Sequence, residues 1–150
     1  MKAEDIGEIY EIEKISFSLP WDINSFYDEL KHPERACYLT AGLKDADKAL
    51  RILGYGGFWL IADEINIVNI AVHPGYRRQG IASSLLKNLL LMGSQKGAKI
   101  ATLEVRAGNI AALKFYEKFN FKLIAIRKKY YQDNKEDACV MWLNPIKVEG

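Results

Sequence analysis

The stretch VHPGYRRQGIA, residues 72–82, separates two segments of different hydrophobic periodicity. The segment before it, EINIVNIAV (64–72), has the composition of a strand. The segment after it, residues 80–96, has apolar side chains at helical spacing, and Gly97 is its predicted end. Residues 99–106, KIATLEVR, then alternate apolar and polar side chains as a strand does. A strand, a helix and a second strand in this order require a right-handed crossover between two parallel strands.

Helix and strand patterns continue on both sides of this unit. The helix patterns cover residues 4–17, 23–31 and 110–119. The strand patterns cover residues 36–43, 51–60, 121–131 and 136–143. This order predicts a single α/β domain, residues 1–150, in which a mixed, mostly antiparallel sheet has a central parallel strand pair flanked by helices.

The composition is that of a globular intracellular protein. Hydrophobic residues make up 49% of the 150 residues, which is enough for a buried core and too many for a disordered chain. The formal net charge of +2 does not require a nucleic-acid partner. The N-terminus is too acidic for a signal peptide, and no apolar stretch approaches the roughly 20 residues that span a bilayer. Cys37 and Cys139 lack metal-site spacing, so we expect reduced thiols, no metal and a cytoplasmic protein that contacts neither membrane nor nucleic acid.

The residues at the start of the long predicted helix suit a phosphate group. A helix N-terminus presents unpaired N–H groups and partial positive charge. Gly80 has no side chain to obstruct close approach of the backbone, and Arg77 and Arg78 supply fixed positive charge. Arg77 to Ala82 are therefore interpreted as a pyrophosphate cradle, although they lack the Walker and Rossmann glycine patterns. A solvated basic loop before an ordinary helix is the alternative, and the residues alone leave both open.

Two further side chains lie near the predicted ligand-binding edge. In such sheets ligands favour the carboxyl ends of the parallel strands, which are Val72 and Arg106 here. Glu104 could act as a general base, and Tyr116 could act as a general acid. The alternatives are a strand glutamate paired with a neighbouring Lys or Arg, and a tyrosine in the core of a helix.

The pattern Arg-x-x-Gly-x-Ala at residues 77–82, after a strand that ends Ile70-Ala71-Val72, resembles the acetyl-CoA motif of the GNAT N-acetyltransferases. Longer segments are similar to the members that acetylate the N-terminal alanine of a ribosomal protein. These segments are SFSLPWD (16–22), NIAVHPGYRRQGIA (69–82), LEVRAGNIAALKFYEKFNF (103–121) and RKKYYQDNKEDACVMWL (127–143). One departure is Asn120, where the family usually has glycine, but asparagine tolerates the left-handed conformation of a helix stop.

The resemblance implies the GNAT fold, with acetyl-CoA as co-substrate. It makes Glu104 the proton acceptor and Tyr116 the proton donor to the leaving thiolate. It also implies that the two parallel strands splay and that the backbone near Val72 supplies N–H donors for the developing oxyanion. The residues implied to bind acetyl-CoA are Ile70, Ala71, Val72, Arg77, Arg78, Gln79, Gly80, Ile81, Ala82, Ser83 and Asn109, with Arg77 at the rim.

The resemblance also places an acceptor peptide between the loop that joins the first two helices and the last strand hairpin. Trp21 would form a wall of this pocket, and Tyr130 and Tyr131 would hydrogen-bond the peptide backbone. Packing beneath the loops is the alternative for these side chains. The basic run 127–129 is interpreted as a solvated strand edge in preference to a surface that approaches the ribosome.

The expected activity is acetyl transfer from acetyl-CoA to the N-terminal α-amine of a ribosomal protein. By resemblance, the acceptor is the N-terminal alanine of the eighteenth small-subunit protein. Direct attack of the amine on the thioester is expected because neither cysteine lies in the loops that follow the two parallel strands, after Val72 and after Arg106. The alternatives are acetylation of other N-termini, lysine side chains or small amines, and a non-catalytic acyl-CoA-binding sensor. A monomer is expected.

Overall fold

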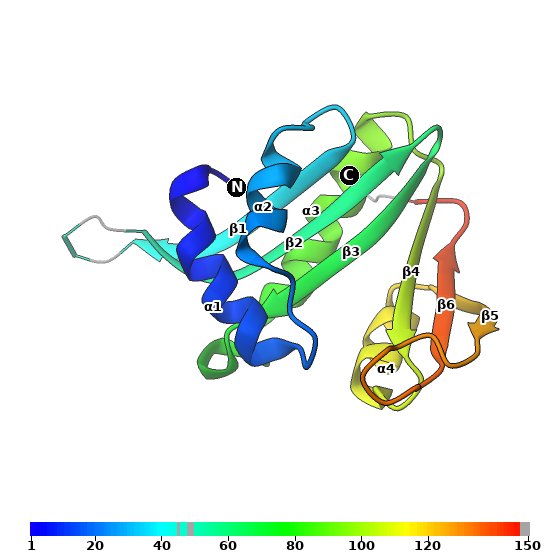
Figure 1. Cartoon of the computed structure of the whole chain (residues 1–150). Helices are drawn as coiled ribbons and strands as arrows, with labels where there is room; N and C mark the ends of the chain where they lie inside the picture. Colours follow the sequence, from blue (N-terminus) through cyan, green and yellow to red (C-terminus); the bar gives the residue numbers. More distant parts are fainter. Residues whose placement is uncertain (45, 48–49, 148–150) are drawn as a thin grey trace.

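Six strands of the described chain form one mixed sheet in the order β1-β2-β3-β4-β6-β5 (Figure 1). The structure is a computed structural model, and it describes residues 1–44, 46–47 and 50–147. The strands are β1 (Ala36–Lys44), β2 (Leu50–Ile61), β3 (Glu64–Val72), β4 (Ile100–Arg106), β5 (Lys122–Arg127) and β6 (Ala138–Leu143). The helices are η1 (Ala3–Asp5), α1 (Ile6–Ser16), α2 (Ile23–Leu30), η2 (Pro74–Tyr76), α3 (Ile81–Gln95) and α4 (Ile110–Lys118), where η marks a 3-10 helix. The pair β3–β4 is parallel and the other pairs are antiparallel, which confirms the predicted fold class.

Local capping or a left-handed residue accounts for four α-helix boundaries that lie within one residue of the prediction. Asp22 and Asn109 each accept a hydrogen bond from a backbone amide of the helix that follows, at 2.8 and 3.1 Å. Gly97, with a φ of +93°, follows the end of α3. Asn120 adopts a φ of +69° after α4, so asparagine replaces glycine at this helix stop as expected.

Three predicted boundaries were wrong by two residues or more. The last strand, β6, begins at Ala138 and not at Glu136, because Glu136 and Asp137 belong to the preceding loop and accept hydrogen bonds from the Gly108 and Lys129 amides. The first α-helix begins at Ile6, two residues later than predicted, because the residues before it form the 3-10 helix η1. The strand predicted to reach Tyr131 ends at Arg127. Lys129 has a φ of +51°, which an extended strand cannot contain, and its amide donates to the Asp137 carboxylate at 2.9 Å. The chain therefore turns before the two tyrosines.

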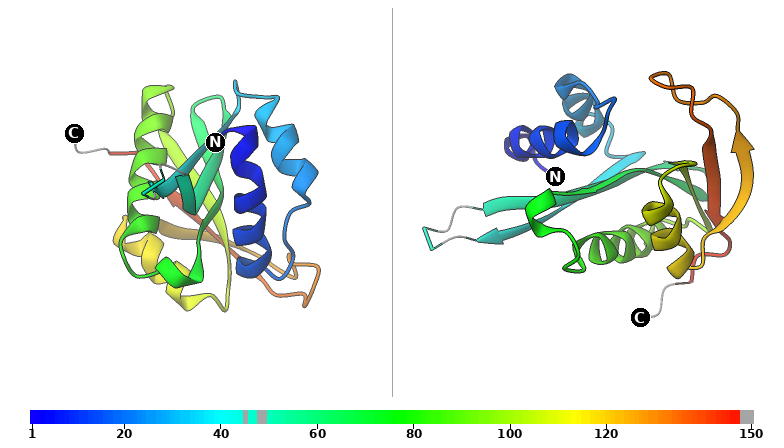
Figure 2. Two further views of the ribbon diagram at one scale, coloured as in Figure 1. Left: turned by 90° about the vertical axis from the view of Figure 1, so that its left-hand side faces the viewer. Right: turned by 90° about the horizontal axis from the view of Figure 1, so that it is seen from below.

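Helices cover both faces of the sheet: α1 and α2 lie on one face, and α3 and α4 lie on the other (Figure 2). The core beneath α1 and α2 includes the buried side chains Ile6, Ile9, Ile12, Phe26 and Tyr55. The core beneath α3 and α4 includes the buried side chains Phe58, Ile65, Leu86, Leu89, Leu103 and Phe121. No helix among the described residues combines the length and the apolar character needed to cross a membrane.

The two parallel strands pair over only three residues each. Residues 64–66 of β3 pair with residues 100–102 of β4, and beyond this point the strands diverge (Figure 1). On its other edge β3 pairs with β2, but the register skips Val68 between Ile67 and Asn69. Such a β-bulge bends a strand and increases its twist. The bulge therefore turns the second half of β3 away from β4 and opens the sheet at the predicted ligand-binding edge.

Candidate active site

A cavity of about 460 Å³ lies between the end of β3, the first turn of α3 and the start of α4. The predicted acetyl-CoA-binding residues that line it are Ile70, Ala71, Val72, Arg77, Arg78, Gly80, Ile81, Ala82, Ser83 and Asn109. Gln79 is exposed and does not belong to this lining. The structure therefore brings together three separate segments of the predicted acetyl-CoA-binding set: the end of β3, the loop and first turn of α3, and Asn109.

The first turn of α3 leaves its backbone amides available to a ligand. The first hydrogen bond of the helix runs from the Ser84 amide to the Gly80 carbonyl at 3.0 Å, so the amides of residues 81–83 have no acceptor within the helix. No side chain caps this end of α3. Gly80 adopts a left-handed conformation with a φ of +80°, and a Cβ atom there would meet nothing within 4 Å. Glycine is thus favoured here by the backbone conformation and not by a close protein neighbour.

Arg77 braces the loop before α3. Its Nε donates to the Val72 carbonyl at 3.0 Å, and its Nη2 donates to the Ser16 hydroxyl at 3.4 Å. These contacts tie the loop to the end of β3 and to the end of α1. Arg77 and Arg78 are both exposed and both line the cavity, but the Arg77 guanidinium already donates to Val72 and Ser16, so the charge of Arg78 is better placed to meet an anion.

A second cavity, of about 600 Å³, lies where β3 and β4 diverge. Its lining includes both predicted catalytic residues, Glu104 and Tyr116. It also includes the three predicted acceptor-binding residues, Trp21, Tyr130 and Tyr131. The residues that line both cavities are Ser16, Phe17, Ile70, Asn109 and Ala112. The two cavities therefore adjoin at the opening of the sheet.

Glu104 lies on β4 and is partly accessible from the second cavity. Its side chain is 27% exposed. Its Oε2 accepts a hydrogen bond from the Tyr130 hydroxyl at 3.2 Å, and its Oε1 lies 3.6 Å from Nε of Arg127. Glu104 is therefore paired with a neighbouring cation, Arg127, as the predicted alternative for this residue requires. This pairing does not exclude a catalytic role, because Arg127 is more than half exposed and the contact is long.

The comparison with protein families decides what kind of protein has this geometry. Residues 6–121 match the acetyltransferase (GNAT) family. The chain belongs to the GNAT family. GNAT acetyltransferases use acetyl-CoA, and the uncapped first turn of α3 beside a cavity fits the phosphates of that molecule.

Individual relatives resemble the chain over almost its full length. It is 41% identical over 143 residues to a Bacillus subtilis protein provisionally named as a ribosomal protein bS18-alanine N-acetyltransferase, covering 95% of this chain and 91% of the relative. It is 33% identical over 150 residues to the ribosomal protein bS18-alanine N-acetyltransferase of Escherichia coli K12, covering 99% and 96%. The crystal structure of the ribosomal-protein-S18-alanine N-acetyltransferase from Escherichia coli superposes with a TM-score of 0.83 at 32% identity, covering 100% of this chain and 93% of that chain. The chain is an acetyl-CoA-dependent acetyltransferase.

Within this GNAT site Tyr116 is held by aromatic neighbours. Its ring packs against Phe115 and Phe121 at centroid distances of 5.1 and 5.6 Å. No hydrogen bond joins its hydroxyl to another residue of the described chain, so the hydroxyl can meet a ligand in the cavity. Burial raises the pKa of Tyr116, so the hydroxyl keeps its proton at neutral pH. Core packing and proton donation are compatible roles for this residue.

The three predicted acceptor-binding residues differ in how firmly they are held. The Trp21 ring packs against Phe26 and Trp59 at 5.4 and 6.3 Å, so the predicted alternative of packing beneath the loop is also present. The Tyr131 ring lies 3.9 Å from the guanidinium of Arg106, and burial raises its pKa to about 12. Tyr130 is exposed and reaches Glu104 through its hydroxyl.

Sequence reasoning missed Glu13 as a residue of the second cavity. This glutamate of α1 is 1% exposed. Its carboxylate accepts hydrogen bonds from the Tyr55 hydroxyl, from the Trp21 amide at 3.0 Å and from Nδ2 of Asn69 at 3.4 Å. Burial raises the pKa of Glu13, although the hydrogen bonds from Tyr55 and Trp21 oppose this shift. The available signal was a charged residue on the apolar face of the first helix.

Among the described residues, no group of three or more His, Cys, Asp or Glu side chains could hold a metal ion. Cys37 and Cys139 are buried, and neither lines either cavity.

Proposed function

We propose that this enzyme acetylates the N-terminal α-amine of a ribosomal protein, and that the N-terminal alanine of bS18 is its acceptor. The observation that carries the proposal is the pair of adjoining cavities at the divergence of β3 and β4, with Glu104 and Tyr116 in the second one. The choice of acceptor is supported by the names of two relatives, which align with this chain over 91% and 96% of their own length.

The first cavity would hold acetyl-CoA, which supplies an activated acetyl carbonyl when bound. The amides of residues 81–83 and the charge of Arg78 would bind its phosphates. The edge of β3 beyond Asn66 has no ladder partner on β4 and can provide N–H donors for the carbonyl oxygen.

Glu104 would accept the proton of the incoming ammonium, directly or through water. An α-amino group has a pKa of about 7.7–8.0 and a lysine side chain one of about 10.4, so a single carboxylate suits the α-amine better near neutral pH. Tyr116 would donate a proton to the departing sulfur, since burial keeps its hydroxyl protonated. Attack would be direct, because neither cysteine lines a cavity.

The test compares wild-type enzyme with Glu104→Gln and with Glu117→Gln, a control at an exposed position on α4. The acceptors are a peptide with the N-terminal sequence of bS18, the same peptide with a blocked α-amine and an added lysine, and a small amine. Thiol release gives the rate, and mass spectrometry locates the acetyl group. We expect α-amine acetylation by wild type and the control, and a loss of about 10²-fold or more in kcat/KM for Glu104→Gln.

Acetyl-CoA binding, measured by calorimetry, should not change in Glu104→Gln, because Glu104 does not line the first cavity. A wild-type rate for this variant at every pH would refute the assignment of the base. Acetylation of the lysine peptide alone would show a different acceptor class. Acetyl-CoA binding without turnover on any amine would support the sensor alternative.

A further inference from the structure

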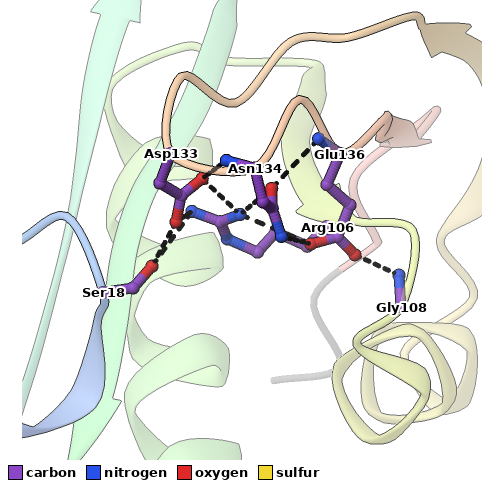
Figure 3. A network of polar contacts seen from close by, with 6 residues as sticks. All are labelled: Ser18, Arg106, Gly108, Asp133, Asn134 and Glu136. Atoms are coloured by element: carbon purple, nitrogen blue, oxygen red, sulfur yellow. Dashed lines mark hydrogen bonds and ion pairs between the residues drawn. The ribbon is translucent and has the colours of Figure 1, made fainter.

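Three segments that are far apart in the sequence meet at the rim of the second cavity (Figure 3). They are the loop between α1 and α2, the carboxyl end of β4 and the connection between β5 and β6. Arg106 of β4 holds Asp133 with two hydrogen bonds, Nη1 to Oδ1 at 3.0 Å and Nη2 to Oδ2 at 2.9 Å. Ser18 joins the same pair from the α1–α2 loop: its hydroxyl donates to Asp133 at 2.6 Å and accepts from Arg106 at 3.2 Å.

The same guanidinium also organises the rest of the β5–β6 connection. Its Nη1 donates to Oδ1 of Asn134 at 3.2 Å and to Oε1 of Glu136 at 3.3 Å. The other oxygen of Glu136 accepts from the Gly108 amide at 2.7 Å, directly before the cap of α4 (Figure 3). The Ser18 hydroxyl and Arg106 lower the pKa of Asp133 to about 2, so the cluster remains charged across the working pH range.

A chain of packed rings connects this cluster to the predicted base. The guanidinium of Arg106 lies over the Tyr131 ring at 3.9 Å. The Tyr130 ring meets Tyr131 edge to face, with centroids 5.1 Å apart and an interplanar angle of 88°. The Tyr130 hydroxyl donates to Oε2 of Glu104 at 3.2 Å. The position of the β5–β6 connection therefore determines whether Tyr130 can reach Glu104.

We propose that Ser18, Arg106 and Asp133 form a latch that joins the two loops over the acceptor cavity and holds Tyr130 on Glu104. The inference rests on the proposed function, because it assigns the second cavity to the acceptor. Ser18 is the member that connects the α1–α2 loop to the other two, 88 and 115 residues away in the chain. When this connection is lost, the loops must be ordered as the peptide binds, so acceptor affinity falls.

The latch acts on acceptor binding and leaves acetyl-CoA binding unchanged. Ser18 and Arg106 line the second cavity, and none of the three latch residues lines the first. Arg106 is accordingly a positioning residue, since it acts on Glu104 through Tyr131 and Tyr130. A residue needed only for folding would lower the fraction of active enzyme, and hence the apparent kcat, and would leave both KM values unchanged.

The experiment uses the full chain with Ser18→Ala, Ser18→Thr and the control Ser94→Ala, an exposed serine at the end of α3 outside both cavities. Steady-state kinetics give kcat and the KM values for the peptide and for acetyl-CoA. Ser18→Ala should raise the peptide KM about 10-fold, as expected for loss of a hydrogen bond to a charged group. The kcat should stay within about 2-fold, because Arg106 still holds Asp133 through two hydrogen bonds and the contacts from Arg106 through Tyr131 and Tyr130 to Glu104 remain. Ser18→Thr keeps the hydroxyl and should restore the peptide KM. Ser94→Ala should change neither.

Amide hydrogen exchange on the free protein tests the latch independently of turnover. Exchange in residues 128–137 should become faster in Ser18→Ala and should not change in Ser94→Ala. An unchanged peptide KM, or an equal rise in both KM values, would overturn the proposal, as would unaltered exchange in Ser18→Ala. A wild-type enzyme that acetylates no amine would refute the proposed function, and the exchange result would still show whether Ser18 joins the loops.

Discussion

Replacement of Glu13 by alanine is expected to lower the free energy of unfolding by about 2–4 kcal/mol. The variant leaves three donors without their acceptor: the Tyr55 hydroxyl, the Trp21 amide and the Asn69 amide group. Tyr55 is fully buried, and a buried donor without a partner costs about 1–3 kcal/mol. Trp21 and Asn69 are half-buried, so water can replace part of their bonds. The space left by the removed atoms adds roughly 1 kcal/mol.

Glu13→Gln keeps the size of the side chain and one acceptor oxygen, but it replaces the other acceptor by an NH2 donor. The pH dependence of its stability relative to wild type separates the effect of the charge from that of the lost acceptor. Burial raises the pKa of Glu13 above its ordinary value of 4.5, so the folded protein binds this proton more tightly than the unfolded chain. The resulting stabilisation is fully present below pH 4.5, the ordinary value, and is lost as the pH rises through the raised value. The stability of wild type relative to Glu13→Gln should therefore fall as the pH increases above about 4.5.

Urea unfolding followed by tryptophan fluorescence measures both effects. Glu11 provides the matched control, because it lies on the same helix with a side chain that is 68% exposed. Glu11→Ala and Glu11→Gln should change stability little at any pH. The reasoning would be refuted if Glu13→Ala were no more destabilising than Glu11→Ala. A wild-type to Glu13→Gln difference that does not vary with pH would refute the claim about the charge.

Two other substitutions test the two cavities separately. Gly80→Ala should cost about 1–2 kcal/mol in unfolding experiments, since alanine disfavours a φ of +80°, and acetyl-CoA titration should show weaker binding. Normal stability would mean that the loop relaxes at no cost. Tyr116→Phe should lower kcat by about 10-fold or more and leave acetyl-CoA affinity nearly unchanged, because the hydroxyl makes no hydrogen bond to another described residue and Tyr116 does not line the first cavity. A wild-type kcat for Tyr116→Phe would remove Tyr116 as the acid.

The parts of the fold that could be predicted have their signal within a few neighbouring residues. Asp22 and Asn109 cap helices through amides two and three residues later, and β4 alternates buried and half-buried side chains. The end of β5 could not be predicted in this way. It depends on the positive φ of Lys129, whose amide is held by Asp137 across a turn.

In the candidate site, too, contiguous residues could be predicted and contacts between distant segments could not. The residues of the loop before α3 are contiguous, so their pattern was visible and the structure gathers nearly all of them at one cavity. Glu13 was missed because Tyr55 and Asn69 lie 42 and 56 residues away. The contact of Arg106 with Asp133 spans 27 residues. A sequence shows that a charge is present, but its partner depends on how distant segments pack.

The brief pairing of β3 with β4 has a consequence for how this enzyme can vary. Three residue pairs join the two halves of the sheet, and the substrates are proposed to meet directly beyond them. The β-bulge at Val68 lies directly beyond these three pairs, and a bulge bends and twists its strand. A substitution or deletion that made β3 more regular here would therefore act on the shape of the opening as well as on the stability of the sheet.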